Sequence, residues 1–249
     1  VLFVHGSDVD HTFCRPWVDP LCDVARLLFV DLVGHGRSDP GAIDDWNLNA
    51  WADSLADLCG TLRVRPVVAG FSLGGRVAMR LAVRHPETVA ALALVNASGV
   101  ARPDRTSAMF RKHGGDAAAL AYERDLANPT TESMNEWFRL CQPLTVKRPY
   151  TADEFADMVP PVPGVTEQLV KQRNRPENLL PELSVIGCPT LVMTGDSDPL
   201  STPDDATDLV TAIGPNATLC VIENSGHGVF RDNPEAFLET TQAFIRGIG

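Results

Sequence analysis

Long apolar runs are missing from this chain of 249 residues, and so is any excess of basic residues. A membrane-spanning helix needs about 20 predominantly apolar residues in a row, whereas the apolar runs here are strand-length or interrupted. The 21 Lys and Arg residues are outnumbered by 32 Asp and Glu residues, which gives a formal net charge of -11. Because binding to nucleic acid requires a basic face, we expect a protein that acts on neither membranes nor nucleic acid.

Paired cysteine motifs are missing as well. The six cysteines are widely spaced, without a Cys-x-x-Cys pair or the histidine spacing of a zinc site. Free thiols are typical of a reducing compartment, so we expect a cytoplasmic protein. Asp8, Asp10 and His11 are residue types that bind metals, but they lack the helical i, i+4 pairing of a metal motif. We therefore expect no metal ion and no cofactor.

Strand and helix patterns alternate along the front of the chain, whose length fits one α/β domain. Apolar runs predict buried strands at residues 1–4, 26–31, 67–71 and 89–95. Helical patterns lie between them, at residues 15–25, 49–62 and 73–84. This alternation predicts the α/β class with a doubly wound, mostly parallel sheet.

The alternation stops after Asn96. Residues 102–183 contain no convincing buried strand and instead carry helical stretches separated by prolines, at residues 117–127, 131–140, 152–158 and 166–172. Strand patterns return at residues 190–194 and 218–222, and helical patterns follow them at residues 203–213 and 234–245. We predict a core of residues 1–101 and 184–249, with residues 102–183 inserted between two strands as a helical cap.

The segment Gly70-Phe71-Ser72-Leu73-Gly74 has the pattern Gly-x-Ser-x-Gly, between an apolar strand and a helix-forming run. In a nucleophile elbow, the serine lies in a strained turn that lifts its hydroxyl above the edge of the sheet. Glycines two residues before and after the serine remove side chains that would collide there. Ser72 is therefore a candidate nucleophile, and a glycine-rich connection with a surface serine is the alternative for this pentapeptide alone.

Two further reactive side chains follow the later strands, Asp198 after residues 190–194 and His227 after residues 218–222. Ligands of a doubly wound sheet bind beyond the carboxyl ends of the strands, and the elbow requires the order serine, acid, histidine. A serine hydroxyl needs an imidazole to take its proton, and the imidazolium needs a carboxylate to orient it. We predict a triad of Ser72, Asp198 and His227, with Asp196 as the rival acid.

The oxyanion that forms on nucleophilic attack needs preorganised hydrogen-bond donors. The backbone N–H of Leu73, directly after the nucleophile, is the first candidate, and that of Ser7, directly after His5-Gly6, is the second. His5 itself is expected to stabilise its loop. Candidates for an aromatic substrate pocket, or for the core of the cap, are Trp137, Phe138 and Tyr150.

Over essentially its whole length the chain resembles the α/β-hydrolase superfamily. The motifs that carry the resemblance are His5-Gly6, Asp31-x-x-Gly34-His35-Gly36-Arg37-Ser38, Gly70 to Gly75, Gly195-x-x-Asp198 and Gly226-His227. The resemblance implies the same triad and the same two oxyanion amides that the residues indicate. It also implies an antiparallel pair of strands ahead of residues 1–4. Because the sequence opens on Val1 within an apolar run, we expect that residues have been removed ahead of it, and no signal peptide is expected in it.

Within the superfamily the motifs conflict. The segments from Glu223 to His227 and around Gln142-Pro143-Leu144 look like proline iminopeptidases, whereas the front half is more similar to capped esterases, enol-lactone hydrolases and carbon–carbon bond hydrolases. We predict a serine hydrolase that cleaves a small carboxylic ester or lactone through an acyl-enzyme, as a monomer or homodimer. The alternatives are an aminopeptidase that holds the substrate ammonium with Glu132 and Glu136, a carbon–carbon bond hydrolase or lyase, and a ligand-binding module.

Overall fold

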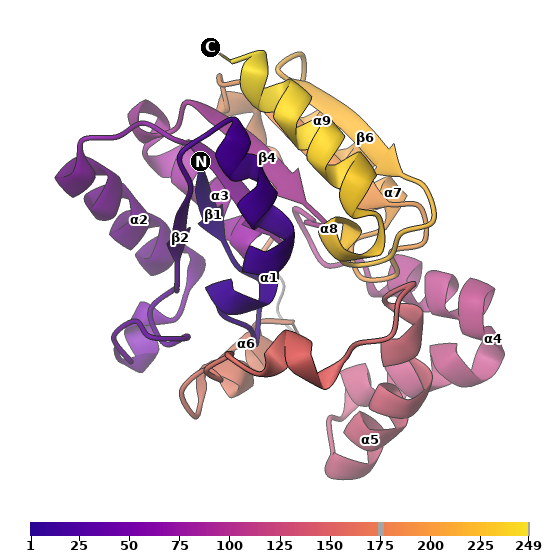
Figure 1. Cartoon of the computed structure of the whole chain (residues 1–249). Helices are drawn as coiled ribbons and strands as arrows, with labels where there is room; N and C mark the ends of the chain where they lie inside the picture. The colour runs from indigo at the N-terminus through magenta and orange to yellow at the C-terminus, as the bar shows by residue number, and fades with distance from the viewer. Residues whose placement is uncertain (174–176, 249) are drawn as a thin grey trace.

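Residues 1–173 and 177–248 are described by the computed structural model of the chain, and they build one sheet. The strands run in the order β2-β1-β3-β4-β5-β6, and every neighbouring pair is parallel (Figure 1). These strands are β1 (Leu2–Val4), β2 (Leu28–Val30), β3 (Val67–Phe71), β4 (Ala91–Val95), β5 (Thr190–Gly195) and β6 (Ala217–Ile222). The predicted doubly wound α/β fold is confirmed.

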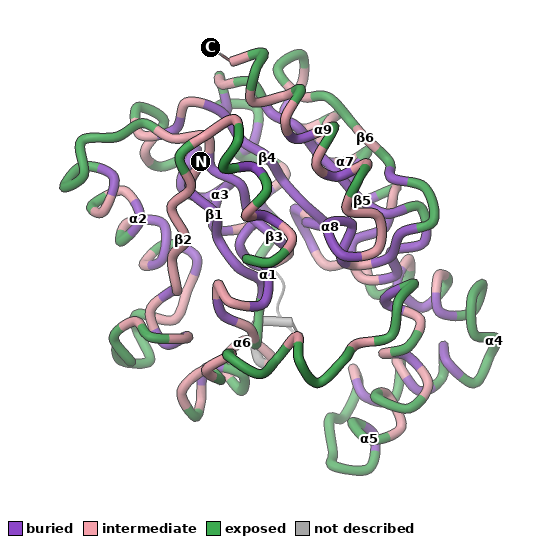
Figure 2. Tube along the Cα trace, in the orientation of Figure 1, coloured by how far each residue is buried: buried purple, intermediate pink, exposed green. Residues whose placement is uncertain are grey.

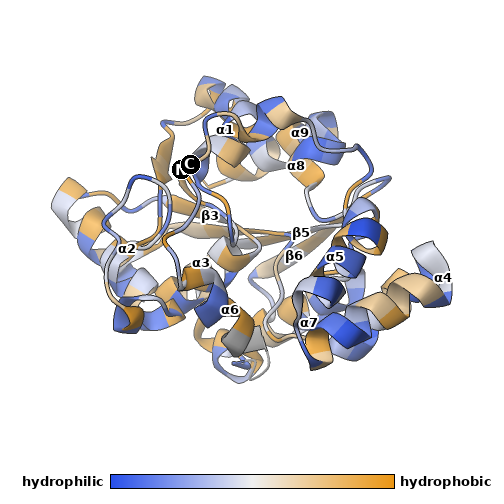
Figure 3. Cartoon of the chain, turned by 90° about the horizontal axis from the view of Figure 1, so that it is seen from below, coloured by the Kyte–Doolittle hydropathy of each residue, from blue (hydrophilic) through white to orange (hydrophobic). Residues whose placement is uncertain are grey.

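Helices cover both faces of the sheet (Figure 3). One face carries α2 (Leu48–Leu62), α3 (Leu73–Arg84) and α7 (Pro203–Ile213), and the other carries α1 (His11–Val18), α8 (Val229–Asp232) and α9 (Pro234–Arg246). Successive residues of a strand point to opposite faces, so Leu92 and Leu94 of β4 pack into the first layer, whereas Ala93 and Val95 pack into the second. A strand buried on both faces needs apolar residues throughout, which explains the continuous apolar run of β4.

Helices α4 (Pro103–Ala127), α5 (Thr131–Leu140) and α6 (Val165–Arg173) lie between β4 and β5 in the chain and below the sheet in Figure 1. Helices α4 and α5 are largely exposed, in contrast to the buried strands β1, β3, β4 and β5 (Figure 2). Among the described helices, none combines the length and the apolar content that crossing a membrane requires. The division into core and cap at residues 102–183 stays a prediction, and residues 174–176 lie outside the described residues.

Two helices of this region differ from those predicted. Helix α4 begins at Pro103 rather than at residue 117, because it continues through a kink at Gly115, where φ is 74° and ψ is -173°. A pair of glycines inside a helical pattern reads as a break in the sequence, so the first half of α4 was not predicted. The helix expected at residues 152–158 is a short 3-10 helix, Ala152–Phe155.

Helix α1 is shifted towards the N-terminus relative to the helix predicted at residues 15–25. It begins at His11 because the carboxylate of Asp10 accepts a hydrogen bond from the N–H of Thr12 at 2.9 Å, which caps the helix. It ends at Val18, and the chain continues as a 3-10 helix, Asp19–Asp23, that contains Pro20. Proline has no N–H for an α-helical hydrogen bond, so the predicted helix is divided at this point.

The connection from β3 to α3 is a strained turn, as the glycine pattern predicts. Ser72 has φ 52° and ψ -112°, a conformation that non-glycine residues rarely adopt. A Cβ added to Gly70 would lie 2.3 Å from the carbonyl oxygen of Gly74, and one added to Gly74 would lie 2.2 Å from that of Val4. The two glycines are therefore required by the close approach of α3 to β3 and β1.

The same geometry predicts opposite effects for two glycine-to-alanine substitutions. Gly74→Ala is expected to lower the free energy of unfolding by about 3 kcal/mol, because its Cβ would overlap a backbone oxygen that cannot move away. Gly60→Ala, in α2, is the matched control, because a Cβ there meets nothing within 4 Å. It is expected to raise stability by about 0.5–1 kcal/mol. Urea unfolding of the two variants measures both changes, and equal stabilities would contradict the packing described here.

Candidate active site

The carboxyl ends of three strands bring together Ser72 after β3, Asp198 after β5 and His227 after β6. Atom Nε2 of His227 lies 3.1 Å from Oγ of Ser72, and Nδ1 lies 2.9 Å from Oδ2 of Asp198. Both distances are within hydrogen-bond reach for a nucleophile, a base and the group that orients the base. With Nδ1–H donating to the carboxylate, Nε2 is free to accept the serine proton.

Asp198 is held by donors other than His227. Its side chain is fully buried. Atom Oδ1 accepts hydrogen bonds from the N–H groups of Leu200 at 2.8 Å and Ser201 at 3.0 Å, and Oδ2 accepts one from Nδ2 of Asn96 at 2.9 Å. Donors of this kind stabilise a buried carboxylate in its charged form and fix its orientation, so its remaining lone pairs face the imidazole.

The rival acid, Asp196, has a different set of partners. Its carboxylate accepts hydrogen bonds from the backbone N–H groups of Asn224 and Ser225 at 3.0 and 3.1 Å, and from the hydroxyl of Ser197 at 3.0 Å. Burial opposes its ionisation, but these hydrogen bonds outweigh burial and lower the pKa of Asp196. Asp196 therefore holds the loop that precedes the histidine, and Asp198 is the carboxylate that the fold brings to His227.

Asn96 is a site residue that the sequence analysis missed. It follows β4, is fully buried and has φ 47°. Its Nδ2 donates to Oδ2 of Asp198 at 2.9 Å and to the carbonyl oxygen of Gly226 at 3.0 Å, while its Oδ1 accepts from the N–H of Val229 at 3.1 Å. One amide thus joins the acid loop to the histidine loop. The signal in the sequence that could have identified Asn96 is its position directly after a buried strand, because ligands of such sheets bind beyond the carboxyl ends of the strands.

Removing the side-chain amide of Asn96 is expected to lower both the free energy of unfolding and kcat. Asn96→Ala leaves a buried carbonyl and a buried N–H without partners, which should cost about 2–4 kcal/mol of unfolding free energy, and it removes one of the donors that orient Asp198. Asn224→Ala is the matched control, because Asn224 also has a positive φ, 52°, but is exposed. Chemical denaturation and kcat for an ester substrate measure the two effects. Equal behaviour of the two variants would contradict the bridging role.

The two predicted oxyanion amides belong to segments that adjoin Ser72. Leu73 is the first residue of α3, and the first N–H groups of a helix have no partner within the helix. The position of a Cβ on Gly6 is 3.5 Å from Cβ of Ser72, so the loop that carries Ser7 passes beside the serine. Ser7 is exposed. The roles of both amides in binding an oxyanion stay predictions.

His5 links two loops, which agrees with the expectation that it stabilises its own loop. Its Nδ1 lies 2.7 Å from the carbonyl oxygen of Gly6, and its Nε2 lies 3.0 Å from the N–H of Leu32. An imidazole that donates at one nitrogen and accepts at the other is neutral. Burial and the neighbouring His35 lower the pKa of His5 to about 4. A histidine with both nitrogens engaged and so low a pKa is unsuited to general base catalysis.

In the structure, the polar cluster near the start of α1 contains Asp31 in place of Asp8. Ligand atoms of Asp10, His11 and Asp31 lie within 4.8 Å of one another, whereas Asp8 instead accepts a hydrogen bond from the hydroxyl of Thr166 at 2.6 Å. The donor types would suit a divalent cation. However, Nδ1 of His11 is 2.8 Å from the Asp31 carboxylate, and Asp10 caps α1. These groups are therefore engaged by the protein itself.

The three aromatic candidates lie among other side chains. Trp137 and Phe138 form an edge-to-face pair on α5 with ring centres 5.3 Å apart, and Phe138 is 56% exposed. Tyr150 has its ring 4.3 Å from the guanidinium of Arg231, and burial raises its pKa to about 12. Within the described residues, no ring contact or hydrogen bond joins these side chains to Ser72. Their predicted contact with substrate stays a prediction.

Comparisons with known proteins agree with the fold. A family model described as the alpha/beta hydrolase fold matches residues 1–234. The chain is 30% identical to the pimeloyl-[acyl-carrier protein] methyl ester esterase of Nitrosomonas europaea, over 98% of this chain and 94% of that protein. It is 25% identical to the solved structure of an esterase from Thermogutta terrifontis, with a TM-score of 0.67 over 99% of this chain and 89% of the other.

The proline iminopeptidase of Mycobacterium smegmatis also has a similar structure, with a TM-score of 0.76 over 99% of this chain and 89% of that one. Its sequence is only 19% identical, so this likeness concerns the fold alone. The family model, by contrast, spans the sheet, the connection at Ser72 and the loop of His227 in one match. On that match, and on the esterase that is similar over nearly its whole length, this chain belongs to the alpha/beta-hydrolase family and is a hydrolase.

Proposed function

We propose that the protein cleaves a small carboxylic ester or lactone, with Ser72 as the nucleophile of a covalent acyl-enzyme. The observation that carries the proposal is the continuous chain of contacts from Oγ of Ser72 through the imidazole of His227 to the carboxylate of Asp198, at 3.1 and 2.9 Å. A hydroxyl beside a base that is itself oriented by a carboxylate is the arrangement that activates serine.

Each group has one task in the proposed reaction. His227 takes the proton of Ser72 as Oγ attacks the carbonyl carbon, and it returns that proton to the departing alcohol oxygen. Asp198, which is fully buried, stabilises the imidazolium while it exists. The acyl-enzyme is then hydrolysed by a water molecule that His227 deprotonates in the same way. The serine leaves the cycle unchanged.

Charge that develops on the carbonyl oxygen requires donors that are already oriented. The N–H of Leu73 suits this task because it opens α3, where the helix dipole favours negative charge. The N–H of Ser7 is the proposed second donor, since its loop passes beside Ser72. Each such donor is typically worth about 10²- to 10³-fold in rate.

Two relatives named as esterases support the choice of an ester as substrate. The test is a panel of p-nitrophenyl esters of increasing chain length and simple lactones, combined with labelling by a fluorophosphonate probe. We expect hydrolysis of at least one ester and covalent labelling at Ser72. A chain that binds esters without turning them over and does not react with the probe would be a binding module, and the proposal would fail.

The aminopeptidase alternative receives less support from the side chains chosen for it. The carboxylate of Glu136 is 2.7 Å from the guanidinium of Arg124, and Glu132 is exposed on α5. An ammonium ligand needs an unpaired carboxylate near the nucleophile. Comparing proline 4-nitroanilide with its N-acetylated form decides between the two activities, because a strong preference for the free amine would favour the aminopeptidase.

We also propose that the protein acts in the cytoplasm on a small-molecule substrate. All six cysteines are free thiols in the structure, including the exposed Cys22. Disulfides are rare where glutathione keeps thiols reduced, so six unpaired cysteines fit a reducing compartment.

A further inference from the structure

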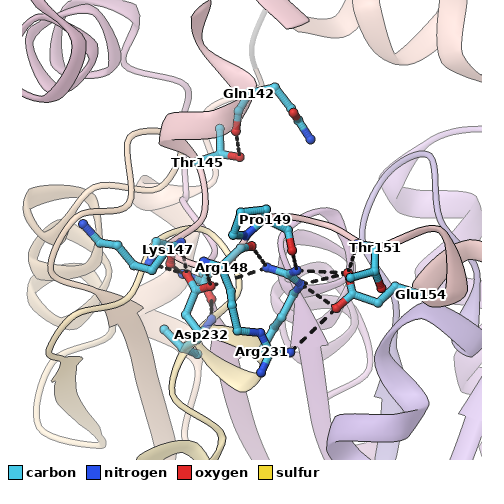
Figure 4. A network of polar contacts seen from close by, with 12 residues as sticks. Gln142, Thr145, Lys147, Arg148, Pro149, Thr151, Glu154, Arg231 and Asp232 are labelled. Atoms are coloured by element: carbon cyan, nitrogen blue, oxygen red, sulfur yellow. Dashed lines mark hydrogen bonds and ion pairs between the residues drawn. The ribbon is translucent and has the colours of Figure 1, made fainter. Parts of the chain in front are cut away.

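Arg231 is a buried cation that the proposed mechanism does not use. Its side chain, in α8, is 1% exposed. The guanidinium forms a two-pronged pair with Glu154, with Nε–Oε1 at 3.1 Å and Nη2–Oε2 at 3.0 Å (Figure 4). It also donates to the carbonyl oxygen of Arg148 and, at 2.7 Å, to that of Pro149. Because a buried charge is costly unless it is fully paired, this arrangement fixes α8 against residues 148–154.

The next residue, Asp232, joins the same segment to the loop of the proposed base. Its side chain is fully buried. Atom Oδ2 accepts hydrogen bonds from the N–H groups of Gly226 at 2.8 Å and Lys147 at 3.0 Å, and Oδ1 accepts one from the N–H of Arg148 at 3.3 Å. Gly226 directly precedes His227, so one carboxylate connects the backbone beside the imidazole to residues 147–148.

A direct backbone contact completes the connection. The N–H of His227 donates to the carbonyl oxygen of Thr145 at 2.6 Å. A Cβ on Gly226 would lie 2.3 Å from the same oxygen, so the two segments approach as closely as glycine allows. Residues 145–155, the strap, therefore contact the N–H of His227 and pack against Gly226 directly through Thr145, and they are joined to the N–H of Gly226 through Asp232. Figure 4 shows strap residues around Arg231 and Asp232, namely Lys147, Arg148, Pro149, Thr151 and Glu154.

We propose that Arg231 and Asp232 are positioning residues, which hold the imidazole of His227 at Ser72 by clamping the strap against its loop. The proposal rests on the proposed function, since it requires His227 to be the general base. The imidazole must stay 3.1 Å from Oγ of Ser72 and 2.9 Å from Asp198 at the same time. A misplacement of about 1 Å can cost about 10²-fold in rate.

The position of the strap gives this clamp a second consequence. The strap belongs to residues 102–183, the predicted cap, and its 3-10 helix Ala152–Phe155 packs beside α1 of the core. The side chain of Phe155 stacks on that of Phe13 with ring centres 5.6 Å apart. The clamp therefore ties the loop of the base to the predicted cap. Because its contacts hold the backbone beside the imidazole rather than the substrate, loosening them should affect turnover more than substrate binding.

Two substitutions test the proposal, one at each residue of the clamp. Asp232→Asn replaces one carboxylate oxygen by an amide nitrogen, which cannot accept a hydrogen bond. A nitrogen at the Oδ2 position loses the N–H groups of Gly226 and Lys147, and one at the Oδ1 position loses that of Arg148. Arg231→Lys keeps the charge but loses the two-pronged pair with Glu154. We expect kcat for a p-nitrophenyl ester and the rate of fluorophosphonate labelling to fall about 10- to 100-fold in each variant, with KM changed less than about 3-fold.

The matched control is Arg105→Lys. Arg105 of α4 pairs with Asp205 and Asp208 of α7, both at 2.7 Å, and so links the predicted cap to the core away from the histidine loop. We expect it to lose some thermal stability and to keep the parent kcat and labelling rate. A purely structural clamp would behave like this control, with a lower Tm but unchanged turnover of the folded enzyme.

Each outcome decides a separate point. A folded Asp232→Asn enzyme that labels and turns over at the parent rate would overturn the proposal, and Arg231→Lys decides it if Asp232→Asn does not fold. If the parent protein neither hydrolyses the esters nor reacts with the fluorophosphonate, the proposed function fails and the positioning role fails with it. An active parent with unaffected variants overturns the positioning role alone.

Discussion

Replacing Ser72 by alanine is expected to reduce kcat for any ester that the parent protein hydrolyses by about 10⁴- to 10⁶-fold. The hydroxyl oxygen is the atom that would form the acyl bond, and the structure contains it 3.1 Å from the imidazole that would accept its proton. Without it, only the binding groups and the oxyanion donors remain, and they cannot form the covalent intermediate. Covalent labelling by a fluorophosphonate should disappear completely in the same variant.

The control for this experiment is Ser54→Ala, which removes an exposed hydroxyl from α2. It should leave kcat and labelling unchanged, and both variants should unfold at nearly the parent temperature, since alanine occupies less space than serine. Steady-state kinetics with purified protein, together with mass spectrometry of the labelled peptide, supplies the measurement. Full turnover in Ser72→Ala would exclude Ser72 as the nucleophile and leave the elbow as a structural turn.

The second large effect is expected from Asp198, the acid of the predicted triad. Asp198→Asn should reduce kcat by about 10⁴-fold, because a neutral amide neither stabilises the imidazolium nor fixes the imidazole tautomer. The amide would have nearly the same shape as the carboxylate, and its oxygen could still accept from the N–H groups of Leu200 and Ser201, although its nitrogen could no longer accept from Asn96. The fold is therefore expected to persist while the chemistry fails.

Asp196→Asn is the matched control, since Asp196 begins the same loop, directly after β5, and also accepts hydrogen bonds from backbone N–H groups. It should lower the free energy of unfolding by about 1–2 kcal/mol and change kcat by less than about tenfold. Comparison of kcat and Tm for the two variants separates the acid that orients the imidazole from the acid that holds its loop. If Asp196→Asn caused the larger loss of kcat, the assignment of Asp198 would be wrong.

The positions of the candidate triad could be predicted because each residue follows a strand pattern in the chain. Parallel strands place their carboxyl ends at one edge of the sheet, so Ser72, Asp198 and His227 had to lie near one another once the strands were recognised. The clash that Gly70 avoids is local, with the carbonyl oxygen of Gly74, whereas the clash that Gly74 avoids is with Val4 of β1, so Gly74 could be recognised only from the motif. Recognition of a site from such a pattern requires only secondary structure and strand order.

Asn96 and the clamp could not be predicted in this way. Asn96 bonds to Asp198 and Gly226, and Arg231 bonds to Glu154, all far away in the chain. An asparagine after a strand resembles any turn residue, and an arginine in a short helix resembles any surface cation. Only the packed structure reveals that both side chains are buried and fully engaged.

By itself, the sequence determined the fold class, the strained turn at Ser72 and the residue types that can form a triad, since each of these depends on local periodicity or on sterics within a few residues. Tertiary structure alone decided that Asp198 rather than Asp196 reaches His227, that Asn96 joins the two loops, and that Arg231 and Asp232 hold the strap against the histidine loop. The physical reason is that hydrogen bonds between distant segments depend on distances of a few ångströms, which side-chain packing sets and residue spacing along the chain does not.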